Sequence, residues 1–141
     1  MRYGYIALAF GLSACSGGGI FGGDDAPDMP SYFLNAGFEI GMAQTTAEVC
    51  SSVDFKDERA TARQQAVAEQ LVADGHTADE LRQWQASPEY KEWAEARTLA
   101  YFNEKGIPPE VNLGEASDDA CRIADEEIAA ESGIGRLLEK V

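Results

Sequence analysis

The sequence predicts an all-α domain, a small bundle of roughly five helices braced by one disulfide. Three observations predict this fold class. Apolar residues recur at helical spacing from residue 31 onward, capping residues and glycines separate the periodic segments, and two cysteines lie within them. The stretch before residue 31 has neither pattern. We therefore divide the chain into three parts, at residues 1–14, 15–30 and 31–141.

Residues 1–14 have the layout of a signal peptide for export. Arg2 is their only charge, a ten-residue apolar run follows it, and two small residues precede Cys15. The apolar run is too short to cross a bilayer as a helix, which takes about 20 residues. We therefore expect this segment to direct export and to be removed.

The tetrapeptide at residues 12–15, Leu-Ser-Ala-Cys, resembles the lipobox of bacterial lipoproteins. The resemblance implies that Cys15 is lipidated, becomes the first residue of the mature chain and binds the bilayer through its acyl chains. Two or three such chains anchor a protein stably, whereas one is marginal. Ser16 in place of an aspartate favours the outer membrane, with the domain facing the periplasm. The alternative is an ordinary cleaved signal that leaves Cys15 as a free thiol.

Residues 16–30 are expected to form a flexible tether. They contain five glycines, three aspartates and two prolines, a composition that does not form a packed element. A flexible coil of this length holds a domain about 20 Å from its anchor on average. The second part of the chain, residues 15–30, is therefore the lipidated cysteine and its tether.

The mature chain is strongly acidic. All 25 Asp and Glu but only 10 of the 11 Lys and Arg lie beyond Cys15, which gives a net charge of −15. A surface of this charge repels nucleic acid and anionic headgroups, so we expect no nucleic-acid partner. The charge indicates either a cationic partner or a solvated surface alone.

The helical domain at 31–141 begins with two predicted helices. Two apolar stripes from Ser31 onward form one wide face that ends at Cys50. Asp54 is a plausible N-cap for a second helix, which we expect to run to about Asp74 because Gly75 follows.

Two more helices follow, each with a clear start. Thr77 and Glu80 fit a capping box, and Ser87 before Pro88 fits an N-cap with proline at the first helical position. The fourth helix is expected to end near Lys105. His76, the only histidine, lies between a helix stop and a cap, where we interpret it as a solvated linker residue rather than a base.

Aromatic residues concentrate around the fourth predicted helix. Trp84, Trp93 and Tyr101 define a possible aromatic contact surface. Aromatic residues at helical spacing are more often core than ligand pocket, so both interpretations are kept.

The last main helix is predicted from Ser117 to about Ser132. We expect its inward side to include four small or apolar residues: Cys121, Ala124, Ile128 and Ala129. The acidic residues of this region are interpreted as a solvated face: Asp118, Asp119, Asp125, Glu126, Glu127 and Glu131. They lack the alternating loop geometry of a calcium site, so no metal or cofactor is expected. Gly133 and Gly135 break the helix, and Leu137 and Leu138 return the tail to apolar surface.

Cys50 and Cys121 are expected to form a disulfide. Once Cys15 is lipidated they are the only cysteines left, and an exported chain meets oxidising conditions. A bridge closing some 70 residues would stabilise the fold by about 4 kcal/mol in the chain-entropy model. The alternatives, a metal site or a catalytic thiol, lack a C-x-x-C motif and a second histidine.

Several of these motifs together resemble a small, uncharacterised alphaproteobacterial family of exported proteins with a domain of unknown function. The residues that carry the resemblance are the two cysteines, the segment Thr77–Leu81, the break at Gly106, and the terminal motif at 132–138. The resemblance spans about residues 33–138 and implies export and a helical fold, with no activity attached. Members of that family more often have a plain signal peptide, so the lipobox departs from the pattern.

The sequence therefore predicts a membrane-anchored periplasmic lipoprotein that acts as a non-enzymatic accessory subunit, with a protein partner in the envelope. A module that binds a small ligand or a cationic peptide is the alternative. A hydrolase is the third hypothesis, and nothing in the sequence selects a catalytic pair for it.

Overall fold

The computed structural model describes residues 28–141, so the predictions for Cys15 and most of the tether lie outside the described residues. The described part contains five α-helices: α2 (Ser31–Val49), α3 (Asp57–Ala73), α4 (Ala78–Ala86), α5 (Pro88–Glu104) and α6 (Ser117–Ala129). It also contains two short strands and two 3-10 helices: β1 (Val53–Phe55), η1 (Leu113–Glu115), η2 (Gly135–Leu137) and β2 (Leu138–Lys140). The all-α prediction is confirmed. Within residues 28–141, no helix has the length and apolar character needed to span a membrane.

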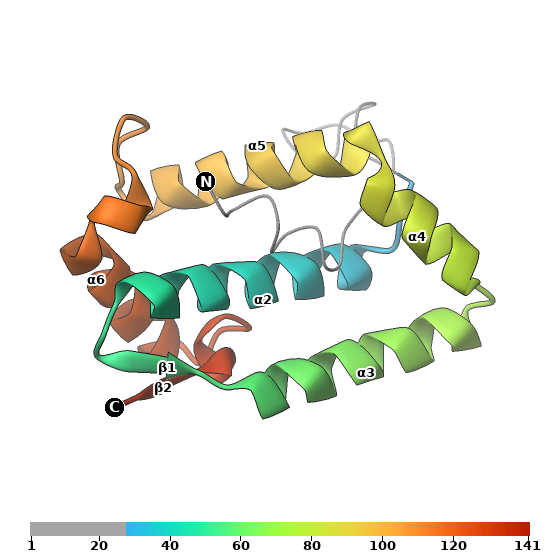
Figure 1. The fold of residues 1–141 in the computed structure, drawn as a ribbon, viewed down its shortest axis with the longest axis horizontal. Helices are drawn as coiled ribbons and strands as arrows, with labels where there is room; N and C mark the ends of the chain where they lie inside the picture. Colours follow the sequence, from blue (N-terminus) through green and yellow to red (C-terminus); the bar gives the residue numbers. More distant parts are fainter. Residues whose placement is uncertain (1–27) are drawn as a thin grey trace.

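Helix α2 is the centre of the fold. In Figure 1, α5 runs along one side of α2 and α3 along the other, α6 lies near its C-terminal end, and α4 joins α3 to α5 at its N-terminal end. Of its 19 residues, 11 are buried, on more than one side. A helix that is apolar nearly all round is stable only when other elements enclose it. The predicted wide face is therefore confirmed.

The predicted helix starts are confirmed where the capping side chains make their bonds. Thr77 Oγ1 accepts from the Glu80 backbone N–H, and the Glu80 carboxylate accepts from the Thr77 N–H at 2.7 Å. Ser87 Oγ accepts from the Tyr90 N–H at 3.2 Å. Gly75 has a φ of +89°, which a side-chain-bearing residue rarely adopts, and α3 ends just before it. Local capping chemistry thus sets these boundaries.

The start of the second helix was predicted wrongly. Asp54 lies in β1, where it pairs with Glu139 of β2, and α3 begins at Asp57 with Lys56 as its N-cap residue. The Lys56 backbone N–H donates to the Leu137 carbonyl at 2.9 Å. Pairing with a segment some 80 residues away therefore satisfies the backbone groups near Asp54, so this stretch forms a strand and needs no helix cap.

The last helix is rotated and shorter than predicted. It ends at Ala129 rather than near residue 132, and Ala129 is exposed, so its prediction as an inward residue was wrong. The buried residues of α6 follow the spacing i, i+3, i+4, i+7: Ala120, Ile123, Ala124 and Glu127. Cys121 and Ile128 are only partly buried, at the edge of this stripe. The rotation puts a carboxylate on the inward face.

Two buried clusters make up the core, one at each end of α2. The larger joins the C-terminal half of α2 to α6 and the tail, and includes Ile123, Leu137 and Leu138. The smaller joins the N-terminal half of α2 to α3, α4 and α5, and includes Phe33 and Tyr90. The return of the two tail leucines to apolar surface is confirmed.

The disulfide between Cys50 and Cys121 is confirmed. The two Cα atoms are 5.0 Å apart, and the bridge spans 71 positions of sequence. Cys50 is fully buried just after α2, and Cys121 lies in the second turn of α6. The Ser52 hydroxyl lies 3.0 Å from Cys50 Sγ and 3.6 Å from Cys121 Sγ. The bridge therefore fixes the end of the central helix to the last one.

Replacing both cysteines by alanine is expected to lower the free energy of unfolding by about 4 kcal/mol, because the unfolded chain loses a closed loop of this length. Denaturant unfolding followed by circular dichroism measures the change. Reduction of the unmodified protein should produce a similar loss, and Ser52→Ala with the bridge intact should stay within about 1 kcal/mol. An unchanged midpoint in the double variant would show that the bridge does not stabilise the fold.

Candidate functional site

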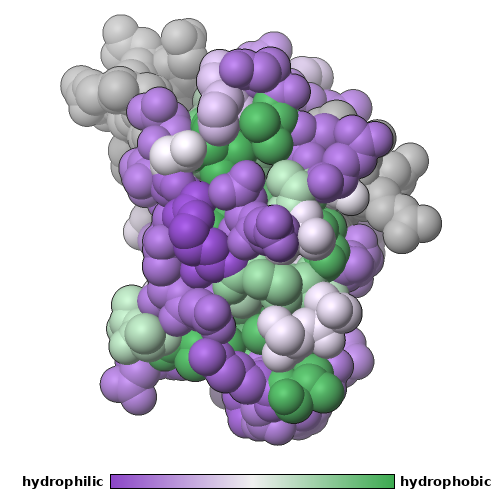
Figure 2. Space-filling model, turned by 90° about the vertical axis from the view of Figure 1, so that its left-hand side faces the viewer, coloured by the Kyte–Doolittle hydropathy of each residue, from purple (hydrophilic) through white to green (hydrophobic). Residues whose placement is uncertain are grey.

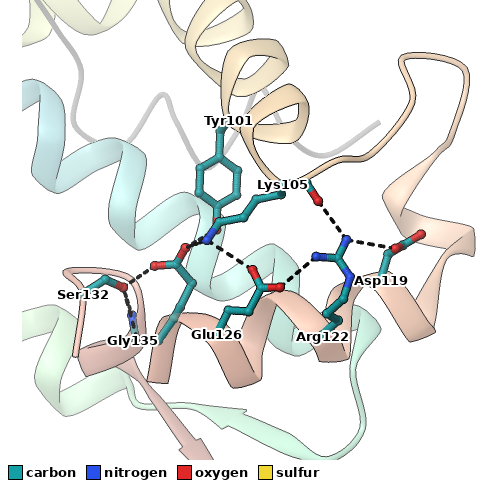
Figure 3. Close-up of polar contacts among 8 residues, drawn as sticks. Tyr101, Lys105, Asp119, Arg122, Glu126, Ser132 and Gly135 are labelled. Atoms are coloured by element: carbon teal, nitrogen blue, oxygen red, sulfur yellow. Dashed lines mark hydrogen bonds and ion pairs between the residues drawn. The ribbon is translucent and has the colours of Figure 1, made fainter. Parts of the chain in front are cut away.

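Glu127 is the centre of the most elaborate polar cluster that the structure describes. It was predicted to lie on a solvated face, and that prediction was wrong, because only 5% of its surface is exposed. Its carboxylate accepts from the Tyr101 hydroxyl at 2.8 Å and from the Ser132 hydroxyl, and it lies 2.6 Å from Lys105 Nζ. Figure 3 shows the side chains of Tyr101, Lys105 and Ser132 directed toward one point beside α6. A buried carboxylate with this many donors is satisfied as an ion.

Two separate segments position the three donors, and a third holds the carboxylate. Tyr101 and Lys105 are four residues apart at the end of α5, so they project from the same side of that helix. Ser132 belongs to the turn after α6, and its hydroxyl also accepts from the Gly135 N–H at 2.9 Å. Glu127 itself is held by α6. The cluster therefore joins α5, α6 and the tail at one point.

The surroundings shift the pKa values of this cluster in favour of the ion pair. Burial alone would raise the pKa of Glu127, but hydrogen bonds from Lys105, Ser132 and Tyr101 outweigh it and hold the pKa below its usual value. Burial likewise opposes the charge of Lys105, yet Glu127 holds the pKa of Lys105 above its usual value. Burial and the neighbouring carboxylate raise the pKa of Tyr101 far enough to keep its hydroxyl a donor.

A second row of charges continues the cluster to the surface. Glu126 lies 3.5 Å from Lys105 Nζ and accepts from Arg122 at 2.9 Å. Arg122 also donates to Asp119 and, at 2.9 Å, to the backbone carbonyl of Lys105. These residues are visible in Figure 3. They are partly exposed, so each pair adds little to stability individually.

An open cleft of about 260 Å³ lies beside Glu127. Helices α2 and α5 and the turn after α6 form its walls: Asn35, Phe38, Glu39, Arg97, Tyr101, Glu104, Lys105, Glu127, Ser132, Gly133 and Ile134. The lining has three glutamates, two cations and two aromatic rings. Its volume is slightly below the roughly 300–1,000 Å³ typical of small-molecule pockets, so it fits a group the size of one side chain.

The predicted aromatic surface divides between two settings. Trp84 is half-buried, with its ring 5.3 Å from Phe33 and 5.0 Å from His76. Trp93 packs against both core clusters, and Tyr101 is 4% exposed. Of the three residues only Tyr101 lines the cleft, and its hydroxyl is used by Glu127. The structure therefore does not bring the three residues into one exposed surface.

Sequence reasoning missed Glu127 although a signal for it was present. Ala120, Ile123 and Ala124 define a helical stripe, and a residue at i+7 from the first of them falls on the same side. Placing Glu127 on this side puts a charged residue on the inward face, and glutamate is rarely buried. The partners Tyr101 and Lys105 lie over 20 residues earlier, so no local pattern reveals them.

Comparison with known proteins bears on this domain as a whole. A model of a family of unknown function, DUF5333, matches residues 30–139. The chain belongs to the DUF5333 family. No curated protein and no solved structure matches it. The DUF5333 match covers all five helices, both cysteines of the bridge and every residue of the cleft. In the described part of the DUF5333 domain, no group of three His, Cys, Asp or Glu side chains is placed to hold a metal ion.

Glu127→Gln is expected to lower the free energy of unfolding by roughly 2–4 kcal/mol at pH 7, because it removes one charge of a buried pair and leaves Lys105 without its nearest counterion. Denaturant unfolding measures the loss. The matched control is Glu126→Gln, at the preceding position and exposed, for which a clearly smaller loss is expected. Equal losses in both variants would contradict the central role of Glu127.

The same variant should flatten the dependence of stability on pH. The pKa of Glu127 is lower in the folded than in the unfolded chain, so its contribution is complete above about pH 4.3 and declines as the pH falls through the folded-state value. Unfolding midpoints measured from pH 7 to pH 3 should therefore fall more steeply for the unmodified protein than for Glu127→Gln. Parallel curves would show that other carboxylates dominate the acid response.

Gly135→Ala is expected to destabilise the fold by more than about 2 kcal/mol, because a Cβ there would overlap the backbone carbonyl of Glu127. Gly133→Ala is the control, since its Cβ would meet only the end of the Glu39 side chain, which can move. Thermal unfolding of the two variants compares the losses. A Gly133 variant as unstable as the Gly135 variant would contradict this account.

Proposed function

We propose that this DUF5333 protein is a non-enzymatic accessory subunit that docks onto a protein complex of the bacterial envelope. In this proposal, acylated Cys15 holds the chain at a membrane of an alphaproteobacterium, with the outer membrane favoured over the inner, and residues 16–30 let the domain reach its partner. Its partners are the lipid bilayer, through Cys15, and a protein. No cofactor takes part.

The hydrogen bonds and the ion pair that satisfy the Glu127 carboxylate are the observation that supports a non-enzymatic function. A catalytic carboxylate needs an oxygen directed at a substrate and a pKa matched to proton transfer. Here the Glu127 carboxylate accepts hydrogen bonds from Tyr101 and Ser132 and pairs with Lys105, and its pKa is lowered rather than raised. The geometry is that of a structural joint between α5, α6 and the tail.

The disulfide supports the exported location. Bridges persist in the periplasm and in secreted proteins and are rare in a reducing cytosol. The Cys50–Cys121 bridge joins two partly or fully buried cysteines within the DUF5333 match. Export through the segment at 1–14 would expose both thiols to oxidising conditions.

The surface charge supports a partner with a basic face. The described cations are largely used in internal pairs, such as Arg59 with Glu139 at 2.6 Å and Lys140 with Asp125 at 3.0 Å. Figure 2 shows hydrophilic side chains covering much of the face at the end where α6 lies, with smaller apolar areas between them. A net charge of −14 for the chain steers positively charged partners toward such a surface.

The second candidate function is a module that binds a small ligand or a cationic peptide. The cleft beside Glu127 favours it, because aromatic rings and carboxylates meet there. The cleft is open and small, so a group presented by a larger partner suits it better than a free ligand that must be largely buried.

The test compares the unmodified protein with Cys15→Ala in its own bacterium. We expect the unmodified protein to fractionate with membranes and to begin, by mass spectrometry, at an acylated Cys15, whereas the variant should be released from the membrane. Crosslinking followed by purification from envelopes should recover a defined partner with the unmodified protein. An unacylated mature N-terminus would contradict the anchor, and the absence of any enriched envelope protein would contradict the accessory role.

A further inference from the structure

The mouth of the cleft contains two carboxylates with unused acceptor capacity. Glu39 Oε2 accepts from Arg63 at 2.9 Å, and no described residue donates a hydrogen bond to its Oε1. Glu104 has one described ion pair, to Arg97 at 3.8 Å, which is beyond hydrogen-bond distance. The side chain of Glu104 is 60% exposed and that of Glu39 is 23% exposed. A ligand that enters here can therefore donate hydrogen bonds to the carboxylates of Glu39 and Glu104.

The two cations of the lining are held against the walls. Lys105 Nζ lies 2.6 Å from Glu127 and 5.5 Å from the centre of the Tyr101 ring. The guanidinium of Arg97 lies 4.4 Å from the centre of the Phe38 ring. A guanidinium is thus already accommodated on an aromatic face of this cleft, beside Glu104, in the arrangement that cation–π attraction favours. Arg97 therefore shows that the cleft accommodates a guanidinium group.

We propose that the cleft between α2, α5 and the turn at 132–134 binds a single arginine side chain of the protein partner, between Glu39 and Glu104. This inference rests on the proposed accessory function and adds the chemistry of the contact. A planar guanidinium offers five donors and pairs with carboxylates in a fixed geometry, and it is less strongly hydrated than an ammonium. The cleft volume of about 260 Å³ suits one such side chain.

Two further observations favour a donor-rich cation over an anion. The lining has three glutamates against two cations, and both cations already face a glutamate. The chain as a whole carries a net charge of −14, so an anionic ligand is repelled before it reaches the cleft. Arginine is also among the residues that most often dominate binding energy at protein interfaces.

The test titrates a capped pentapeptide, acetyl-Gly-Gly-Arg-Gly-Gly-amide, into the ¹⁵N-labelled full-length mature protein and follows backbone amide shifts. We expect saturable shifts at Gly133 and Ile134. The same peptide with citrulline, which has the shape of arginine without the charge, should bind about tenfold more weakly, because charge-assisted hydrogen bonds to the carboxylates are lost.

Variants locate the binding within the cleft. The double change Glu39→Gln with Glu104→Gln should weaken arginine-peptide binding about tenfold, whereas Glu92→Gln with Glu95→Gln, exposed on α5 outside the cleft, removes the same charge and should leave the affinity within about twofold. Arg97→Gln should strengthen binding, because a competitor for Glu104 is removed. Circular dichroism confirms that each variant is folded.

Equal binding of the arginine and citrulline peptides, equal effects of the two double variants, or no saturable shift at the cleft would overturn the arginine site. The accessory function is tested separately. If crosslinking recovers an envelope partner equally well with the Glu39 and Glu104 double variant, the cleft inference fails and the proposed function stands. If no partner is recovered although the peptide binds in the cleft, the preference of the cleft for arginine stands and the accessory function fails.

Discussion

One buried carboxylate is the constraint on which the C-terminal third of the molecule depends. Glu127 can remain charged away from water only while Tyr101, Lys105 and Ser132 all donate to it or neutralise it. Those three side chains come from the end of α5 and from the turn after α6. The requirement of one ion therefore sets the distance between α5 and α6, and it determines where the tail must turn.

The hydrophobic core supplies the rest of the organisation. Helix α2 is apolar on most sides, so it is enclosed by α3 and α5 along its length and by α6 near its end. Tyr101 takes part in both systems, because its ring packs edge-on against Phe38 at 5.5 Å while its hydroxyl reaches Glu127. The cleft is the space left where the packed helices and the charged joint meet. Its mixture of rings and charges follows from that position.

Local features of the sequence were enough to predict much of this fold, and tertiary features were not. The capping box at Thr77, the proline start at Pro88 and the pairing of the two remaining cysteines each depend on residues whose chemistry is self-contained. The strand at Asp54 and the burial of Glu127 depend on partners far along the chain. Single-residue propensity disfavours a buried glutamate, and only the assembled neighbours reverse that preference. Residue-level reasoning therefore located the helices but placed the site on the wrong face of α6.

The position of the disulfide has a mechanical consequence. The chain enters the domain at Ser31, at one end of α2, and the bridge lies just beyond the other end, at Cys50. A pulling force applied at residue 30 acts first on α2, which can unfold only by leaving the two buried clusters of the core. Beyond Cys50 the covalent bond to α6 bypasses the chain between the two cysteines, which are 71 positions apart, so that part of the chain cannot lengthen under load. The domain is thus built to resist extension from its N-terminal side, with its extensible length limited to the first helix and the short segment after Cys121.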